Sequence, residues 1–176
     1  MIVSYLISCA LYLCLVQAEL EVLFEDGGCT RSNDEYIKPD SCEFEVEQDS
    51  EYGTSVSMSI EVTKKVPSLT ALATVLGLER DGEYTVDFGI HVEIDVCQTL
   101  SGPVNVAFPI IKAMNIPPDR CPPEPGVYGS EHYVIEKSNS DGLPESFPSG
   151  KYLFNVTLLT EEGLLIVEYV VYVSVL

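Results

Sequence analysis

The sequence is poor in the residues from which metal sites and catalytic sites are most often built. It has two histidines, His91 and His132, which lie well apart in the chain, and it has no CxxC pair. A structural zinc site needs closely spaced cysteine and histidine ligands, so we expect no metal site. The chain also lacks a GxSxG elbow, a glycine-rich phosphate loop, an HExxH motif and a credible Ser/His/Asp set. We therefore predict that the protein is not an enzyme and uses no cofactor.

Basic residues are scarce as well. Nine lysines and arginines face 28 aspartates and glutamates, which gives a formal net charge of −19. Such a surface repels phosphate backbones, so we exclude nucleic acid as a partner. It also repels anionic lipid headgroups until carboxylates begin to protonate, at about pH 4 to 5. Any transient membrane contact is thus expected to be favoured by acid. The alternative, that the acidity serves only solubility, stays equally open.

No apolar run is long enough to span a bilayer comfortably. Residues 1–18 (MIVSYLISCALYLCLVQA) are apolar and end in small residues, which predicts a signal peptide cleaved after Ala18. This segment lacks a positively charged start, so a retained anchor is the alternative. Residues 19–176 then make a single domain. The expected destination is the extracellular space, or the lysosome or endosome.

Four cysteines remain after the leader, namely Cys29, Cys42, Cys97 and Cys121. An even number of cysteines in a secreted protein indicates disulfides. We favour the pairs Cys29 with Cys42 and Cys97 with Cys121, because each pair brackets a proline- or glycine-rich loop between strand-like runs. The other two connectivities stay open from the sequence.

Apolar and polar residues alternate along much of the chain, which predicts strands. The strand-like runs are 20–24, 42–47, 56–62, 83–97, a segment from Val127 with Tyr133 and Ile135 after a turn, and a hairpin of 151–159 with 164–176. Gly89 indicates a bulge or a close approach of another backbone segment. The run 164–176 is best explained as a buried central strand. Seven to nine such strands indicate an all-β fold, an immunoglobulin-like antiparallel sandwich.

Three segments do not follow this alternation. Residues 67–78 and 102–118 are apolar without being strand-like, so we expect a short helix or an apolar loop in each, and residues 139–148 form a loop. The sequence also lacks tryptophan, the residue that usually fills the core of antibody-type sandwiches. The core volume that a tryptophan would occupy is either packed with aliphatic side chains or left open.

Asn155 begins an N-glycosylation sequon, Asn-Val-Thr, in a predicted strand. If Asn155 carries a glycan, the face of the strand on which it lies must be at least partly exposed to solvent. The alternate residues Tyr152, Phe154, Val156 and Leu158 must then face inward.

Four segments, taken in order, resemble the ML lipid-recognition superfamily, most closely its ganglioside-activator branch and related insect secreted families. They are VSMSIEVTKKV (56–66), IDVC (94–97), RCPPEPGVY (120–128) and LPESFPSGKYLFNVTLL (143–159). The shared pattern is a cysteine after a buried strand, a Cys-Pro followed by Gly-x-Tyr, and a Pro-x-Gly-x-Tyr start to a long hairpin. The last strand departs from the ganglioside activators, because it lacks their cysteine. A hydrolase partner is therefore not carried over from them.

The resemblance implies a β-cup, in which two sheets splay apart around an apolar cavity that takes the acyl chains of a lipid or glycolipid. The expected function is lipid binding or lipid transfer, in which the protein presents the lipid to a hydrolase or receptor or carries it between membranes. The expected wall residues are Phe44, Met58, Ile60, Phe88, Ile90, Val92, Tyr133, Ile135, Phe154, Val156 and Leu158. The expected rim residues are Leu72, Val75, Leu76, Phe108, Ile110, Ile111, Met114, Leu143 and Phe147.

The alternative is a secreted immunoglobulin-like interaction module with a filled core, such as a chemosensory, venom or recognition factor. Cavity volume separates the two hypotheses. A cavity on the order of several hundred Å³ favours lipid binding, whereas close packing throughout favours the interaction module. A small enzyme built on paired carboxylates is a minor third alternative.

Overall fold

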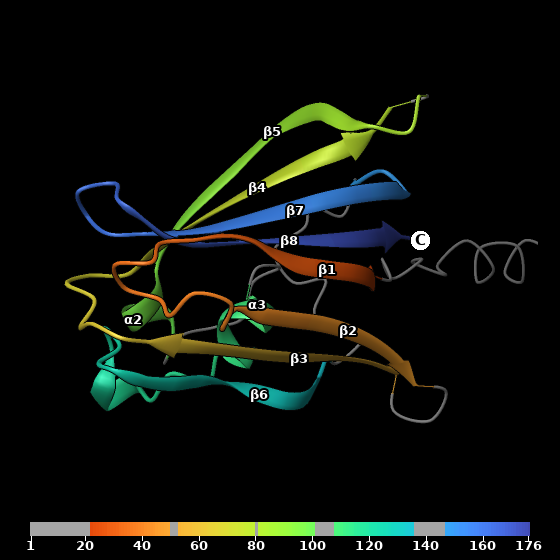
Figure 1. The fold of residues 1–176 in the computed structure, drawn as a ribbon. Helices are drawn as coiled ribbons and strands as arrows, with labels where there is room; N and C mark the ends of the chain where they lie inside the picture. Colours follow the sequence, from red (N-terminus) through yellow and green to blue (C-terminus); the bar gives the residue numbers. More distant parts are fainter. Residues whose placement is uncertain (1–21, 50–52, 80, 101–107, 136–146) are drawn as a thin grey trace, which may run out of the picture.

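The computed structural model describes residues 22–49, 53–79, 81–100, 108–135 and 147–176, which form two antiparallel sheets facing each other (Figure 1). The larger sheet contains, in spatial order, β1 (Val22–Ser32), β8 (Leu165–Val175), β7 (Gly150–Leu159), β4 (Thr70–Leu78) and β5 (Tyr84–Asp95). The smaller sheet contains β2 (Glu43–Asp49), β3 (Gly53–Val62) and β6 (Gly126–Val134). The predicted all-β sandwich is confirmed. The leader 1–18 with its cleavage site, and most of the predicted loop 139–148, lie outside the described residues.

The C-terminal hairpin occupies the middle of the larger sheet, as predicted. β8 pairs with β1 on one side and with β7 on the other. The hairpin turns at residues 160–163, where the Thr160 amide donates to the Leu164 carbonyl at 2.9 Å. β8 has a strand on each side and most of its apolar residues are buried, so the predicted buried central strand is confirmed.

Residues 67–78 contain a strand, β4, and the prediction of a helix or apolar loop there was wrong. β4 pairs with β5 and β7. Ala71 and Ala73 are buried in the core, whereas Leu72 and Leu76 lie half-buried on the outer face. Because apolar residues stand on both faces, the sequence hides the period of two, and the neighbouring strands decide the structure.

The predicted strand 83–97 forms β5 and then a one-turn helix, α2 (Val96–Thr99), whose first turn is capped by the Asp95 carboxylate. The bulge at Gly89 is confirmed, because three residues of β5 (88–90) oppose Val75 alone. Gly89 has a φ of +69°, which favours glycine. The bulge lets β5 turn its side chains locally without leaving the sheet.

The segment from Val127 differs from the prediction in one respect. Tyr133 follows no turn, because β6 runs continuously from Gly126 to Val134. The irregularity is a bulge opposite β3, with His132 at a φ of +54°. A bulge and a turn both interrupt the alternation, so the sequence does not distinguish them.

The prediction for 102–118 is confirmed in its described part, where α3 (Phe108–Ala113) is a short helix packed against β3 and β6. A 3₁₀ turn, η1 (Pro118–Arg120), follows it. Both favoured disulfides are present. Cys29–Cys42 joins β1 to the start of β2, and Cys97–Cys121 joins α2 to the segment before β6. Each disulfide therefore ties one sheet to the other.

Candidate functional site

The facing surfaces of the two sheets are apolar. On β7 the side chains of Phe154, Val156 and Leu158 are buried, and their cross-strand partners on β8 are Val171, Tyr169 and Val167. On the smaller sheet the buried residues of β3 include Val56, Met58, Ile60 and Val62. These faces can hold hydrocarbon, and they offer almost no polar group to a ligand.

The hollow that the described residues enclose between the sheets is small. An apolar hollow beside β3 and β8 has a volume of about 10 Å³, and it is lined by Ile37, Ile60, Val62, Val66, Leu69, Met114, Ile116, Pro123, Tyr128, Leu158, Ile166 and Val167. A cavity of several hundred Å³ is not seen at this position. The segment after α3 explains the difference, because Met114 and Ile116 reach between the sheets and fill their closed end.

The larger sheet extends beyond the smaller one, and its last strand keeps apolar side chains in contact with solvent. Val86 and Val92 of β5 stand opposite Gly77 and Ala73 of β4, so both point to the inner side of the sheet. They are nevertheless 39% and 36% exposed, and Phe88 is 42% exposed. The inner face is thus buried at β7 and β8 and accessible at β5.

Three aromatic rings meet at this accessible edge. The ring centroids of Phe88 and Tyr152 lie 5.5 Å apart, those of Phe147 and Tyr152 lie 4.8 Å apart, and those of Phe88 and Phe147 lie 6.3 Å apart. Phe88 covers Gly77, where any side chain would overlap its ring. The Tyr152 hydroxyl donates to the Pro148 carbonyl at 2.6 Å, and burial raises the pKa of Tyr152. We call Phe88, Phe147 and Tyr152 the aromatic cluster.

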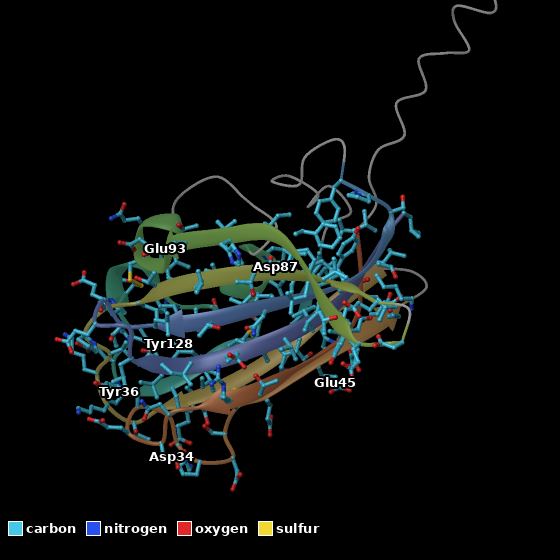
Figure 2. The ribbon with its side chains drawn as sticks, turned by 90° about the horizontal axis from the view of Figure 1, so that it is seen from above. Asp34, Tyr36, Glu45, Asp87, Glu93 and Tyr128 are labelled. Carbon is cyan, nitrogen blue, oxygen red and sulfur yellow. A yellow bond between two sulfur atoms is a disulfide. The ribbon has the colours of Figure 1, made fainter. Side chains whose placement is uncertain are left out.

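The Gly89 bulge positions Phe88 in this cluster. The Asp87 carboxylate accepts a hydrogen bond from the Gly89 amide at 2.7 Å and holds the bulge. His91 lies on the polar side of the strand, as predicted, with its Nε2 3.5 Å from the Asp87 carboxylate. The acidic residues Asp87 and Glu93 lie along β5 (Figure 2). An apolar face and a charged face therefore share one strand.

The predicted lipid-contact residues fall into four groups. Ten are buried: Met58, Ile60, Ile110, Ile111, Met114, Ile135, Phe147, Phe154, Val156 and Leu158. Phe44, Ile90 and Tyr133 are half-buried, Phe88 and Val92 are exposed, and the side chain of Phe108 is outside the described residues.

Two of the predicted rim residues do not lie at a rim. Leu72 and Leu76 lie on the outer face of β4, and this follows from β4 being a strand. Val75 is buried, and Leu143 lies outside the described residues.

The predicted lipid-contact residues did not include Val86, Tyr152 or Tyr169, although the alternation predicted for 152–158 turns the side chain of Tyr152 inward. The alternation of the buried strand 164–176 does the same for Tyr169. Val86 shares the parity of Phe88 in the sequence, and that pattern was available.

The sequon residue Asn155 lies half-buried on the outer face of β7, opposite in direction to the buried Phe154 and Val156. The predicted orientation of this strand is confirmed. Glycosylation itself remains a prediction.

Within the described ranges, no three His, Cys, Asp or Glu side chains come together in a way that could hold a metal ion. None of the helices there has the length and apolar character needed to cross a membrane.

Comparison with known proteins adds one finding. A family model described as the ML domain matches residues 25–167, a span that begins in β1, ends in β8 and includes both sheets. No curated protein matches the chain.

Proposed function

The chain belongs to the ML domain family, whose members generally bind lipids, and from this premise we propose that it binds an acyl chain between its sheets and transfers lipid between membranes. The observation that carries the proposal is the accessible inner face of β5, where Val86, Phe88 and Val92 continue the buried apolar surface out to solvent. Burying hydrocarbon there gains about 0.8 kcal/mol per methylene.

Lipid uptake requires the sheets to part, since the hollow between them holds about 10 Å³. The Cys29–Cys42 disulfide ties β1 to β2, whereas β5 and β6 form the far edges of the two sheets (Figure 1). The Cys97–Cys121 disulfide pins these edges at the α2 end only. Opening is therefore easiest at the other end of β5, where Phe88 lies. Displacement of the aromatic cluster is the first step that we propose.

Transient membrane contact is favoured by acid in this proposal. The hairpin between β4 and β5 exposes Glu79, Asp81 and Glu83 beside the apolar mouth. These charges repel an anionic bilayer at neutral pH. The excess of 28 acidic over nine basic residues in the whole chain falls in acid, and the repulsion from the bilayer falls with it. Vesicles containing phosphatidylserine should bind the protein at pH 4.5 and not at pH 7.4. Equal binding at both values contradicts this part of the proposal.

The two disulfides fit an oxidising compartment. We propose secretion after cleavage at Ala18, glycosylation at Asn155, and work outside the cell or in an acidic lysosome or endosome. Delivery of the lipid to a hydrolase or receptor is the finer role that we propose. It is not carried over from the ganglioside-activator branch, because the last strand lacks that branch's cysteine.

One observation favours a second candidate function. The small volume of the described hollow fits a secreted interaction module that binds partners through its outer strands. Such a protein needs no ligand between its sheets.

Native mass spectrometry of protein secreted from eukaryotic cells separates the two candidates. We expect co-purified lipid, and we expect Val86→Asp to lose it because a charge at the mouth repels a hydrocarbon chain. Val127→Asp is the matched control, since Val127 is 70% exposed on the outer face of β6. Lipid-free protein that also ignores a fluorescent fatty acid overturns the proposal.

A further inference from the structure

Among the described residues, the apolar core contains one buried hydroxyl group without a hydrogen-bond partner. Tyr169 is fully buried on β8, and among the described residues no atom forms a hydrogen bond with its hydroxyl. Its cross-strand neighbours are Val156 on β7 and Cys29 on β1, so its side chain lies on the inner face. Burial without a partner is unfavourable for a hydroxyl. Burial also raises the pKa of Tyr169, so the group remains a hydrogen-bond donor.

A buried water is a poor explanation for this hydroxyl. The hollow of about 10 Å³ is at the lower limit for one water molecule, its lining is apolar, and Tyr169 is not among the residues that line it. A buried water also needs two to four polar partners, roughly. The described neighbours of Tyr169 are Phe44, Val156 and the disulfide-bonded Cys29, and their side chains offer none.

The ring of Phe44 occupies space beside Tyr169 that a ligand larger than water could fill. Phe44 of β2 packs against Tyr169 with ring centroids 5.6 Å apart. The same ring occupies the space above Gly27 of β1, where a side chain would overlap it. Phe44 is half-buried and stands between the unpaired edges of the two sheets. When this ring swings aside, the space over Gly27 opens next to Tyr169.

We propose that the Tyr169 hydroxyl donates a hydrogen bond to a neutral oxygen carried within the hydrocarbon part of the bound lipid. This inference rests on the proposed function and names its ligand class: a single-chain lipid with a hydroxyl or keto oxygen along the chain. An ionised headgroup does not fit, because the inner faces offer no compensating charge.

Strand geometry gives the depth of this oxygen. Tyr152 of the aromatic cluster pairs with Val173, four residues along β8 from Tyr169. At about 3.4 Å per residue, Tyr169 lies roughly 14 Å along the strand from the aromatic cluster. An oxygen near the middle of an eighteen-carbon chain reaches it, whereas one close to either end does not.

The test uses stearic acid and a series of hydroxystearic acids that differ in the position of the hydroxyl. We expect mid-chain hydroxylation to tighten binding about fivefold, in line with one added hydrogen bond. Tyr169→Phe should abolish this preference and leave stearic acid affinity unchanged. Tyr172→Phe is the control, because Tyr172 lies on the opposite face of the same strand.

Tyrosine labelled with ¹³C at Cζ gives a direct readout. The Tyr169 signal, assigned by its loss in Tyr169→Phe, should shift with the mid-chain hydroxystearic acid and much less with stearic acid. Equal affinities for all the acids, or a Tyr169 signal that shifts equally with each of them, overturn the inference while lipid binding stands. If stearic acid itself does not bind, the proposed function fails first. Thermal unfolding verifies that Tyr169→Phe is folded.

Discussion

The rings of Phe88 and Tyr152 meet edge to face, 5.5 Å between centroids, on the inner face of β5 where it is both apolar and exposed. The contact joins the last strand of the larger sheet to its central hairpin without a backbone hydrogen bond between them. A ring held in this way can move without disturbing the sheet, which is the property required of a residue at a mouth.

Phe88→Ala should therefore weaken lipid binding more than it weakens the fold. We expect affinity for a fluorescent fatty acid to fall several-fold, because apolar area at the mouth is lost. The free energy of unfolding should fall by about 1 kcal/mol or less, since the ring is 42% exposed. Displacement titrations and urea unfolding measure the two quantities. Val127→Ala should change neither, and a loss of stability of about 3 kcal/mol in Phe88→Ala would assign the ring to the core instead.

Gly129→Ala should destabilise the sandwich by about 2 to 4 kcal/mol. Gly129 of β6 has a φ of +144°, and a Cβ there would overlap the carbonyl group of Met58 on the adjacent strand. Backbone atoms cannot move aside as a side chain can. Gly28→Ala is the control, because nothing lies within 4 Å of the Cβ position. Urea midpoints that are equal for the two variants contradict the prediction.

Glu168 should make stability depend on pH at the acid end. Its carboxylate accepts hydrogen bonds from Arg31 and, at 2.7 Å, from the Thr30 hydroxyl, and both residues belong to β1. The Arg31 hydrogen bond is the main cause that lowers the pKa of Glu168, and burial opposes it. A lowered pKa in the folded state stabilises the protein above the unfolded pKa, about 4.5, and this contribution disappears as the pH falls through the folded value.

Glu168→Gln should thus lose about 2 kcal/mol at pH 7 and much less at pH 3. Urea unfolding at the two pH values measures the difference. Glu45→Gln, at an exposed position of β2, is the control. A loss for Glu168→Gln that is the same at both pH values would show that packing, and not charge, is responsible.

The disulfides should contribute comparable stability. The pairs are separated by 13 and 24 residues, which corresponds to about 3 kcal/mol for Cys29–Cys42 and about 3.5 kcal/mol for Cys97–Cys121. Double serine variants of each pair, compared by urea unfolding, measure these values. Fatty acid exchange should speed up in both variants, because each disulfide ties the sheets together. An unchanged exchange rate in both variants would contradict opening by separation of the sheets.

The sequence by itself determined the features that depend on local pattern, namely the alternating strands and the hairpin of β7 and β8. It favoured the observed disulfide pairs, and it allowed the bulge at Gly89 and the short helix around Ile110, without settling them. Local pattern is informative here because side-chain period, turn residues and proline limits act over a few positions. Local pattern did not predict the strand β4, because Leu72 and Leu76 on its outer face remove the alternation. Only pairing with β5 and β7 makes residues 70–78 extended.

Only the tertiary structure decided which apolar residues are packed in the core and which remain accessible to solvent. Phe154 and Phe88 look alike in the sequence, yet one is buried by the facing sheet and the other lies where that sheet has ended. The same reason separates Tyr169 from the other tyrosines, because a hydroxyl lacks a partner only when every neighbour brought against it is apolar. Burial depends on the relative width and position of the two sheets, and no short stretch of sequence contains that information.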